Sequence, residues 1–69
     1  MIVRLRQFTA TPVPQWDGRT VDGRTVYVRL DGSDVSMGVG ESWKRAVRST
    51  KPVTDATMLS NLSALGVGQ

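Results

Sequence analysis

The chain has 69 residues, and nine Lys or Arg against six Asp or Glu give it a formal net charge of +3. It contains no Cys and no His, which excludes a disulfide and leaves a structural zinc site without its usual ligands. The same absences remove the commonest general base and the strongest nucleophile of enzymes, so we expect no enzyme activity, no metal, no cofactor and no small-molecule substrate.

We expect a single small domain over residues 1–69. A domain of this size buries only about 60% of the surface of its unfolded chain and is marginally stable alone. Because a disulfide and a zinc site are excluded, packing against a partner or against copies of itself is the remaining source of stability. The modest positive charge is compatible with an acidic protein or a nucleic acid as that partner.

Residues 1–9 alternate apolar and polar side chains, which predicts a short strand with one buried face. Val3 and Leu5 fall on one side of this strand, and Arg4 and Arg6 fall on the other. We therefore expect Val3 and Leu5 in the core and both arginines in solvent.

Residues 10–18, ATPVPQWDG, are predicted to form a Pro-containing extended arm or connector. Pro12 and Pro14 remove backbone donors and hold the preceding residues extended, which argues against a central strand. Trp16 lies outside any periodic apolar face, so it either folds back as a lid on the core or anchors the arm to a partner. Val13, Pro14 and Trp16 would form a compact apolar plug and are the predicted interface.

Residues 17–26 repeat the pentapeptide DGRTV. An odd repeat reverses the faces of a continuous strand, so we expect a turn or a bulge at Asp22-Gly23. A two-residue turn there would pair Val21 with Arg24, which is a poor apolar match. The tight hairpin and the bulge therefore stay open as alternatives.

A hairpin over about 24–30 and 33–39 is predicted at Asp31-Gly32, because a two-residue type I′ turn there aligns favourable cross-strand pairs. Apolar pairs then share one face, and a polar pair and an opposite-charge pair share the other. The expected pairs are Val28 with Val35, Val26 with Met37, Tyr27 with Ser36 and Arg29 with Asp34.

Helical spacing replaces the period of two after Gly40. Trp43, Ala46 and Val47 recur on one side, which predicts a short helix over about 41–49. Basic residues toward its end suit the helix dipole.

A second short helix is predicted after Pro52, which ends the first. Thr54 or Asp55 caps its start, and Gly66 ends it. Its apolar stripe consists of Met58, Leu59, Leu62 and Leu65.

The predicted fold class is therefore α+β, a small antiparallel β-meander of three to four strands followed by two short C-terminal helices. The core is expected to be thin, and its burial to offset the ordering entropy only narrowly. Its predicted members are Val3, Leu5, Val21, Val26, Val28, Leu30, Val35, Met37, Val39, Trp43, Val47, Met58, Leu59, Leu62 and Leu65.

The Asp-Gly pairs and the glycine-rich stretch are typical of turns and loops, and they do not indicate a catalytic or nucleotide-binding site. Asp17, Asp22 and Asp31 each precede a Gly, which is typical of turn residues that bond their own backbone. Gly38 and Gly40 precede a predicted helix but lack the spacing of a phosphate-binding loop. We infer neither a catalytic carboxylate nor a nucleotide site.

Four basic residues surround Trp43 on and after the first predicted helix, and nucleic-acid surfaces combine basic and aromatic side chains in this way. The cluster would contact nucleic acid or an acidic partner, or it is a solvated basic face, which is the commoner role of such clusters. Its members are Lys44, Arg45, Arg48 and Lys51.

The leading hypothesis is a non-enzymatic structural or interaction module that acts in a homo-oligomer or a larger assembly. Short length, a repeated pentapeptide, a composition typical of GC-rich codons and the lack of catalytic residues suggest the small accessory proteins of tailed phages. The favoured role is a virion protein of the minor capsid, decoration or tail type. The alternatives are a small DNA- or RNA-binding regulator that uses the basic helix and an inhibitor of a host protein.

Targeting signals are not expected. No apolar run approaches the about 20 residues of a membrane-spanning helix, and the N-terminal stretch lacks the apolar core of a signal peptide. We therefore expect a protein made in the cytoplasm without membrane contact, and incorporated into a virion under the leading hypothesis. Because the sequence begins with Met1, we expect a complete product rather than an excised fragment.

Overall fold

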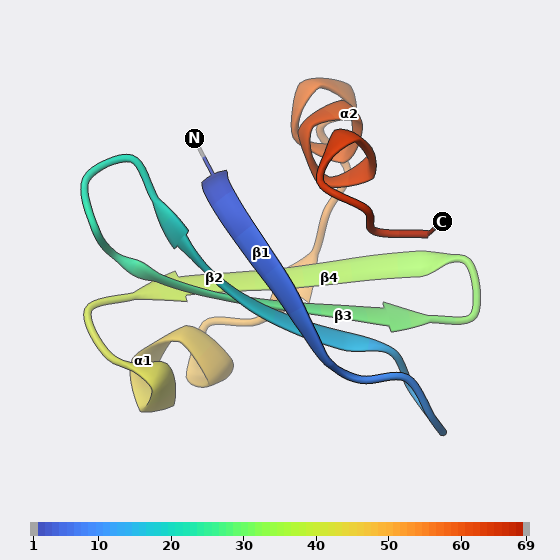
Figure 1. The fold of residues 1–69 in the computed structure, drawn as a ribbon, viewed down its shortest axis with the longest axis horizontal. Helices are drawn as coiled ribbons and strands as arrows, with labels where there is room; N and C mark the ends of the chain where they lie inside the picture. Colours follow the sequence, from blue (N-terminus) through green and yellow to red (C-terminus); the bar gives the residue numbers. More distant parts are fainter. Residues whose placement is uncertain (1, 69) are drawn as a thin grey trace.

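A five-stranded antiparallel sheet, with strands in the order β1-β2-β3-β4-β5, dominates the computed structural model, which describes residues 2–68 (Figure 1). The α+β class and the β-meander are confirmed, but the sheet has five strands rather than three to four. The elements are β1 (Ile2–Thr9), β2 (Gln15–Thr20), β3 (Thr25–Asp31), β4 (Asp34–Gly40), α1 (Trp43–Arg48), β5 (Lys51–Pro52) and α2 (Ala56–Ala64).

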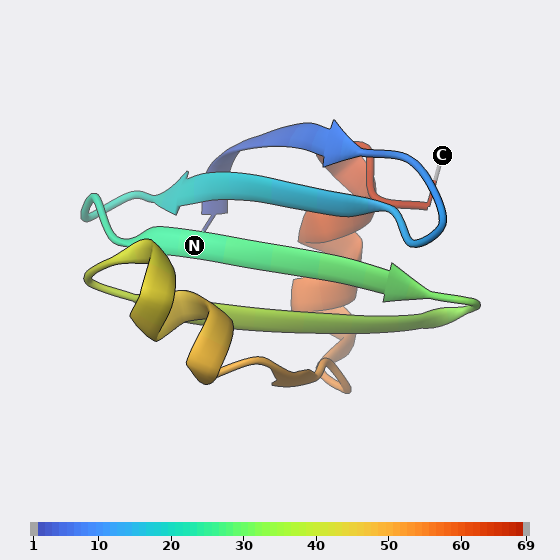
Figure 2. The ribbon, with the colours of Figure 1, turned by 90° about the horizontal axis from the view of Figure 1, so that it is seen from below.

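The two helices lie on opposite faces of the sheet, with α1 in front of it and α2 behind it in Figure 2. The two short helices that were predicted after the meander are present, but they do not form a C-terminal pair. β5 separates them, because Lys51 and Pro52 return the chain to the sheet opposite Met37 and Ser36. A proline is tolerated in this strand because it lies at the edge of the sheet.

One face of the sheet, here called the covered face, packs against α2 and the residues that follow it. Its strands contribute Trp16, Val26 and Val28, which are buried, and α2 contributes Leu62. Half-buried apolar residues of β4 and α2 surround this cluster. Of the core positions predicted in β3 and the second helix, Val26, Val28 and Leu62 are buried, Leu30, Met58 and Leu65 pack half-buried against them, and Leu59 is half-buried outside this cluster. Ile2, Trp16 and Val67 are core residues that the predicted core lacked.

Glycine determines how α2 ends and how Val67 joins the core. Gly66 has a φ of 106°, a conformation that a residue without Cβ adopts readily. The Val67 amide donates to the Leu62 carbonyl at 3.0 Å, and the Gly66 amide donates to the Ser63 carbonyl at 3.0 Å, as in a Schellman motif. The predicted stop at Gly66 is confirmed, as is Asp55 as the N-cap, whose carboxylate accepts from the Met58 amide.

The opposite face, here called the open face, carries α1 over one end of β3 and β4 (Figure 2). Gly38 and Gly40 let the helix backbone approach the sheet, since a Cβ at either position would collide with backbone or Cβ atoms of Arg45 and Ala46. Ala46 is therefore the buried residue of α1. Trp43 and Val47, which were predicted to be core residues, are both more than two-fifths exposed.

The expected arm over 10–18 ends at Pro14, because Gln15 begins β2 and this strand pairs on both sides. Pro14 lies just before the strand, and its carbonyl accepts a hydrogen bond from the Leu30 amide at 3.0 Å. The prolines thus set where the strand begins and do not exclude it. Trp16 then faces Val28 of β3 and is 5% exposed, which agrees with its predicted role as a lid on its own core.

The hairpin between β2 and β3 has a three-residue loop in which Gly23 forms the bulge, so of the two arrangements left open by the sequence the bulge is favoured over the two-residue turn. The Thr20 amide donates to the Arg24 carbonyl at 3.0 Å, and Gly23 has a φ of 86°. Compared with a two-residue turn, this loop shifts the pairing of β2 with β3 by one residue. The shift places Trp16 on the covered face. Val21, a predicted core residue, lies in the loop and is 73% exposed.

The hairpin between β3 and β4 is confirmed, but its register differs by two residues from the predicted one. The turn residues are Gly32 and Ser33, and only Gly32 has a positive φ, as expected for a type II′ turn. Val28 therefore faces Met37 rather than Val35. A shift of two preserves the faces of both strands, so the division into apolar and polar sides is unaffected.

Two bulges interrupt the pairing of β1 with β2, between Ile2 and Arg4 and between Gln7 and Thr9. The first bulge changes which apolar side chain is buried, because Ile2 reaches the core while Val3 is 53% exposed. The prediction of Val3 as a core residue was therefore wrong. Leu5 packs against the core as expected.

Candidate functional site

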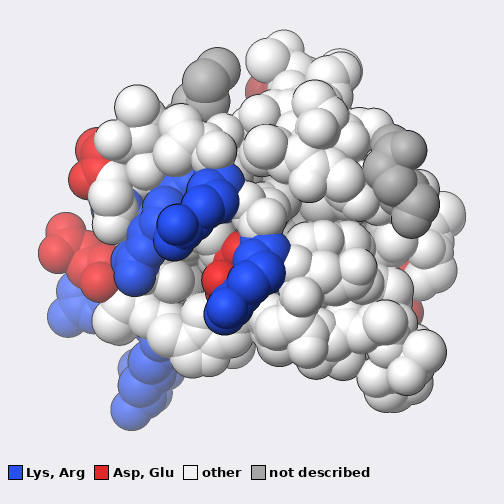
Figure 3. All heavy atoms as spheres, in the orientation of Figure 1, with Lys and Arg blue, Asp and Glu red and all other residues white. Residues whose placement is uncertain are grey.

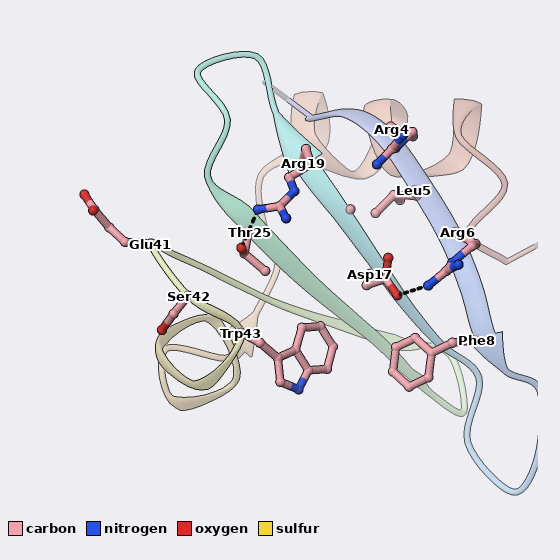
Figure 4. A pocket seen from close by; sticks show the side chains of 11 residues that line it. Arg4, Leu5, Arg6, Phe8, Asp17, Arg19, Thr25, Glu41, Ser42 and Trp43 are labelled. Carbon is pink, nitrogen blue, oxygen red and sulfur yellow. Dashed lines mark hydrogen bonds and ion pairs between the residues drawn. The ribbon is translucent and has the colours of Figure 1, made fainter.

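A groove of about 1020 Å³ lies on the open face, between β1 and β2 on one side and the start of α1 on the other (Figure 4). It is wide and open to solvent, as suits an extended ligand better than a small enclosed one. Its walls are basic and aromatic. The lining residues are Arg4, Leu5, Arg6, Phe8, Asp17, Gly18, Arg19, Thr25, Glu41, Ser42 and Trp43.

Aromatic rings form one side of this groove. Phe8 and Trp43 are each 43% exposed, and their rings meet edge to face with centroids 5.7 Å apart. Trp43 also meets the buried ring of Tyr27 edge to face at 5.3 Å. The contact with Tyr27 fixes the Trp43 ring against the sheet while leaving a large part of it accessible.

Two arginines face each other across the first two strands. Arg4 and Arg19 are register partners in β1 and β2, a position that brings Cβ atoms to about 4.5–5.5 Å. The Arg19 Nη1 donates to the Thr25 hydroxyl at 2.8 Å, which orients its guanidinium. Within residues 2–68 the ion pairs involve other arginines, so Arg4 and Arg19 have no carboxylate partner. Like charges at this position repel each other.

The acidic residues of the groove only partly balance its arginines. Asp17 is the register partner of Arg6, and Arg6 Nη2 lies 3.2 Å from Asp17 Oδ2. Glu41 is exposed at the other side of the groove, just before the helix (Figure 4). The unbalanced positive charge is therefore concentrated at Arg4 and Arg19.

The outer side of β1 is an open edge of the sheet. The strand order places β1 at one end, and within residues 2–68 no strand pairs with its outer side. An edge of this kind presents alternate N–H and C=O groups to solvent. The two bulges leave Arg4–Gln7 as the regularly paired stretch in the middle of the strand.

The residues predicted to form the apolar plug do not come together as an exposed surface. Trp16 is buried in the core of its own chain, while Val13 and Pro14 are half-buried in the connector before β2. The lid interpretation of Trp16 is the one that the structure supports. Whether Val13 and Pro14 contact a partner stays a prediction.

The predicted basic cluster is exposed and lies outside the groove. Lys44, Arg45 and Arg48 belong to α1, and Lys51 belongs to β5. None of them lines the groove. In Figure 3 basic side chains gather on the part of the surface away from α2, whose surroundings are nearly uncharged.

The groove contains residues that the sequence analysis did not connect. Arg19 and Phe8 come from different strands, and only the register of β1 with β2 brings Arg19 opposite Arg4. Arg4 and Arg6 were recognised as sharing a polar face, but Arg19 lies in the repeated pentapeptide, whose turn was not resolved. No short-range signal joins these positions.

The part of the chain that the structure describes contains no cluster of metal ligands and no helix that could span a membrane. Among residues 2–68 no group of three or more Asp or Glu is placed to hold a metal ion. Neither described helix has the length and hydrophobicity to cross a bilayer.

Comparison of the chain with protein-family models, with curated proteins and with solved structures found no match.

Proposed function

We propose that this chain is a non-enzymatic interaction module that joins a larger assembly by pairing β1 with an extended segment of another protein. The single observation that carries the proposal is the open edge of β1. Strand addition to such an edge is a common mode of peptide recognition, in which main-chain hydrogen bonds supply affinity and alternate side chains supply specificity. The two bulges limit the pairing window to about four residues, Arg4–Gln7.

The side chains in this window indicate the chemistry of the partner. Arg4 and Arg6 project on the open face, and Leu5 projects on the covered face with Gln7. A partner strand that carries acidic residues opposite the two arginines would be attracted to this edge. Opposite charges at facing positions of a sheet contribute roughly 0.2–1 kcal/mol for each pair.

A second copy of this chain is a poor partner for the same edge. Antiparallel pairing through Arg4–Gln7 that keeps the covered faces on one side places Arg4 opposite Arg6 of the other copy, or Arg4 opposite Arg4, or Arg6 opposite Arg6. Every such register brings like charges together, which is a common protection of edge strands against self-association. The proposed partner is therefore a different protein with an acidic strand.

The protein itself supplies a probe of this chemistry. The double variant Arg4→Glu, Arg6→Glu carries the acidic strand that the proposal requires, on the same fold. We expect an equimolar mixture of this variant and the wild type to form a heterodimer, while each alone stays monomeric. Sedimentation equilibrium measures the mass directly.

A neutral double variant, Arg4→Gln, Arg6→Gln, is the matched control, because its edge has the same length without the attraction. It should stay monomeric with the wild type. A mixture of wild type and the acidic variant that also stays monomeric, with both proteins folded by circular dichroism, would contradict the proposal, since the edge would then be protected by its bulges and not selective.

The assembly that we favour is a phage particle, in which the chain is a minor capsid, decoration or tail component. Support comes from the short length, the repeated pentapeptide and the composition of the sequence, together with an edge that requires a different protein. Under this proposal the chain co-purifies in fixed stoichiometry with intact particles produced from its own genome. Recovery of the chain only as free protein, and not with the particles, would count against a virion role.

A further inference from the structure

We infer that the groove on the open face binds single-stranded nucleic acid, with Arg4 and Arg19 holding a phosphate and the rings of Trp43 and Phe8 stacking on bases. This site shares Arg4 with the proposed strand-pairing edge of β1, whereas Arg19, Phe8 and Trp43 lie outside the pairing window Arg4–Gln7. It rests on three observations, namely the facing arginines, the exposed rings and the open shape of the groove.

The facing arginines form an anion site that the described residues leave unneutralised. Arg4 and Arg19 are register partners on one face, and the nearest acidic residue in register, Asp17, already pairs with Arg6. A phosphate between the two guanidiniums would convert their repulsion into two charge-assisted hydrogen-bond interactions, which are about twice as strong as neutral ones. The bond from Arg19 to Thr25 holds one of the two in place.

The exposed rings indicate that the ligand carries flat groups that can stack as well as negative charge. Trp43 and Phe8 lie across the groove floor from the arginines in Figure 4, and both are about two-fifths exposed. Base stacking on aromatic side chains contributes about 1–3 kcal/mol for each base, and it needs flat faces that a duplex keeps inside its own stack. Arginines for the backbone beside rings for the bases are therefore suited to a single strand.

The groove also predicts weak binding. Arg4, Arg6 and Arg19 face Asp17 and Glu41 within it, so the local excess is small. Each phosphate of a single strand that a protein contacts contributes about −0.7 to the slope of log K against log salt. One phosphate held by the two arginines gives a slope of roughly −0.7, far shallower than that of a strongly basic protein.

The experiment measures fluorescence anisotropy of a labelled thymidine oligonucleotide, roughly 12 nucleotides long, at two salt concentrations. Trp43→Leu keeps the apolar bulk but removes the stacking ring, and it should weaken binding at least about five-fold. Arg19→Gln keeps a donor toward Thr25 and should weaken binding several-fold while making the salt slope shallower.

Arg48→Gln is the matched control, because it removes the same charge from the exposed face of α1, outside the groove. It should change affinity by less than about two-fold, and duplex DNA of the same length should bind more weakly than the single strand. Circular dichroism of each variant establishes that the fold is intact. Arg19→Gln should leave the heterodimer formed through β1 unchanged, so failure of either proposal can be recognised separately.

Three results would overturn the inference. The first is the absence of binding to the single strand at about 50 mM salt, where phosphate contacts are strong. The second is an Arg48→Gln variant weakened as much as Arg19→Gln while Trp43→Leu binds normally, which would assign binding to the basic helix. The third is equal competition by poly-glutamate, which would show that the groove attracts any polyanion.

Discussion

The two faces of the sheet use the same kind of side chain in different ways, and the two tryptophans make this clear. Trp16 on the covered face is 5% exposed and packs with Val28 and Leu62, whereas Trp43 on the open face is 43% exposed and borders a groove. The covered face is closed by α2, which brings apolar side chains to it. The open face is met by α1, whose own buried residue is Ala46 and whose Trp43 packs on the buried ring of Tyr27. The larger part of the apolar core therefore lies on the covered face, while the open face keeps accessible rings beside a groove.

The largest expected difference between the faces is in stability. Trp16→Ala removes a buried aromatic side chain, and the resulting cavity should cost on the order of 3–5 kcal/mol. Trp43→Ala should cost about 1 kcal/mol or less, because a large part of its ring already contacts water. Urea denaturation monitored by circular dichroism gives both free energies. Equal losses would remove the distinction between the faces.

Glycines provide a second comparison, because each face has one at a close approach of the backbone. A Cβ at Gly18 would collide with the Arg4 carbonyl of β1, and a Cβ at Gly38 would collide with the Ala46 carbonyl and lie 2.9 Å from the Thr50 amide nitrogen. Overpacking of this kind costs about 1–3 kcal/mol. Gly18→Ala should loosen β1, and Gly38→Ala should loosen α1.

Hydrogen exchange measured residue by residue locates these two effects. The amides of α1 should lose protection in Gly38→Ala while those of β1 keep it, and the reverse should hold for Gly18→Ala. Loss of protection over the whole chain in Gly38→Ala would show that α1 is part of the core and that the open face also maintains the fold.

A smaller effect is expected from the facing arginines. Arg4→Gln removes a like-charge pair with Arg19, so the free energy of unfolding should rise by about 0.2–1 kcal/mol at low salt. The gain should shrink at high salt, because exposed charges are then screened. Thermal unfolding at two salt concentrations measures it. A variant that is less stable at low salt would indicate that Arg4 makes favourable contacts within the chain.

The smallest effect concerns the loop between β2 and β3. The buried hydroxyl of Thr20 donates a hydrogen bond to Asp22, and this bond, followed by the nearby Arg24, lowers the pKa of the Asp22 carboxyl below its ordinary 3.8. A lowered pKa means that the carboxylate adds stability above its ordinary pKa, and that this is lost as the pH falls through the lowered value. Asp22→Asn should therefore be less stable than wild type near neutral pH but not in strong acid. A difference that is independent of pH would contradict this role of the charge.

Local signals in the sequence were sufficient for much of the fold. The β3 and β4 hairpin, the apolar face of β3, the cap at Asp55 and the stop at Gly66 all depend on residues that are close in sequence. Errors arose where distant packing decides the outcome. Val3 and Val21 are apolar residues of the kind that is usually buried, but a bulge exposes Val3 and a loop exposes Val21.

The groove could not have been predicted by the same means. The position of Arg19 opposite Arg4 depends on the pairing of β1 with β2, which is interrupted by two register shifts, and no distinctive local pattern in the sequence sets that register. The exposure of Trp43 depends on the close approach of Ala46 to Gly38, which makes Ala46 the residue of α1 that is fully buried against the sheet. The basic cluster on α1 was recognised because its members are close in sequence.

The edge of β1 is proposed to pair with an acidic strand, and its arginines are proposed to prevent it from pairing with itself. The single variant Arg4→Glu tests this most directly, because antiparallel pairing of two copies would place the introduced carboxylate of each opposite Arg6 of the other. We predict that this variant forms a dimer in sedimentation equilibrium, that the dimer weakens with salt, and that Arg4→Gln stays monomeric. A folded Arg4→Glu variant that remains a monomer at every concentration tested would contradict the account.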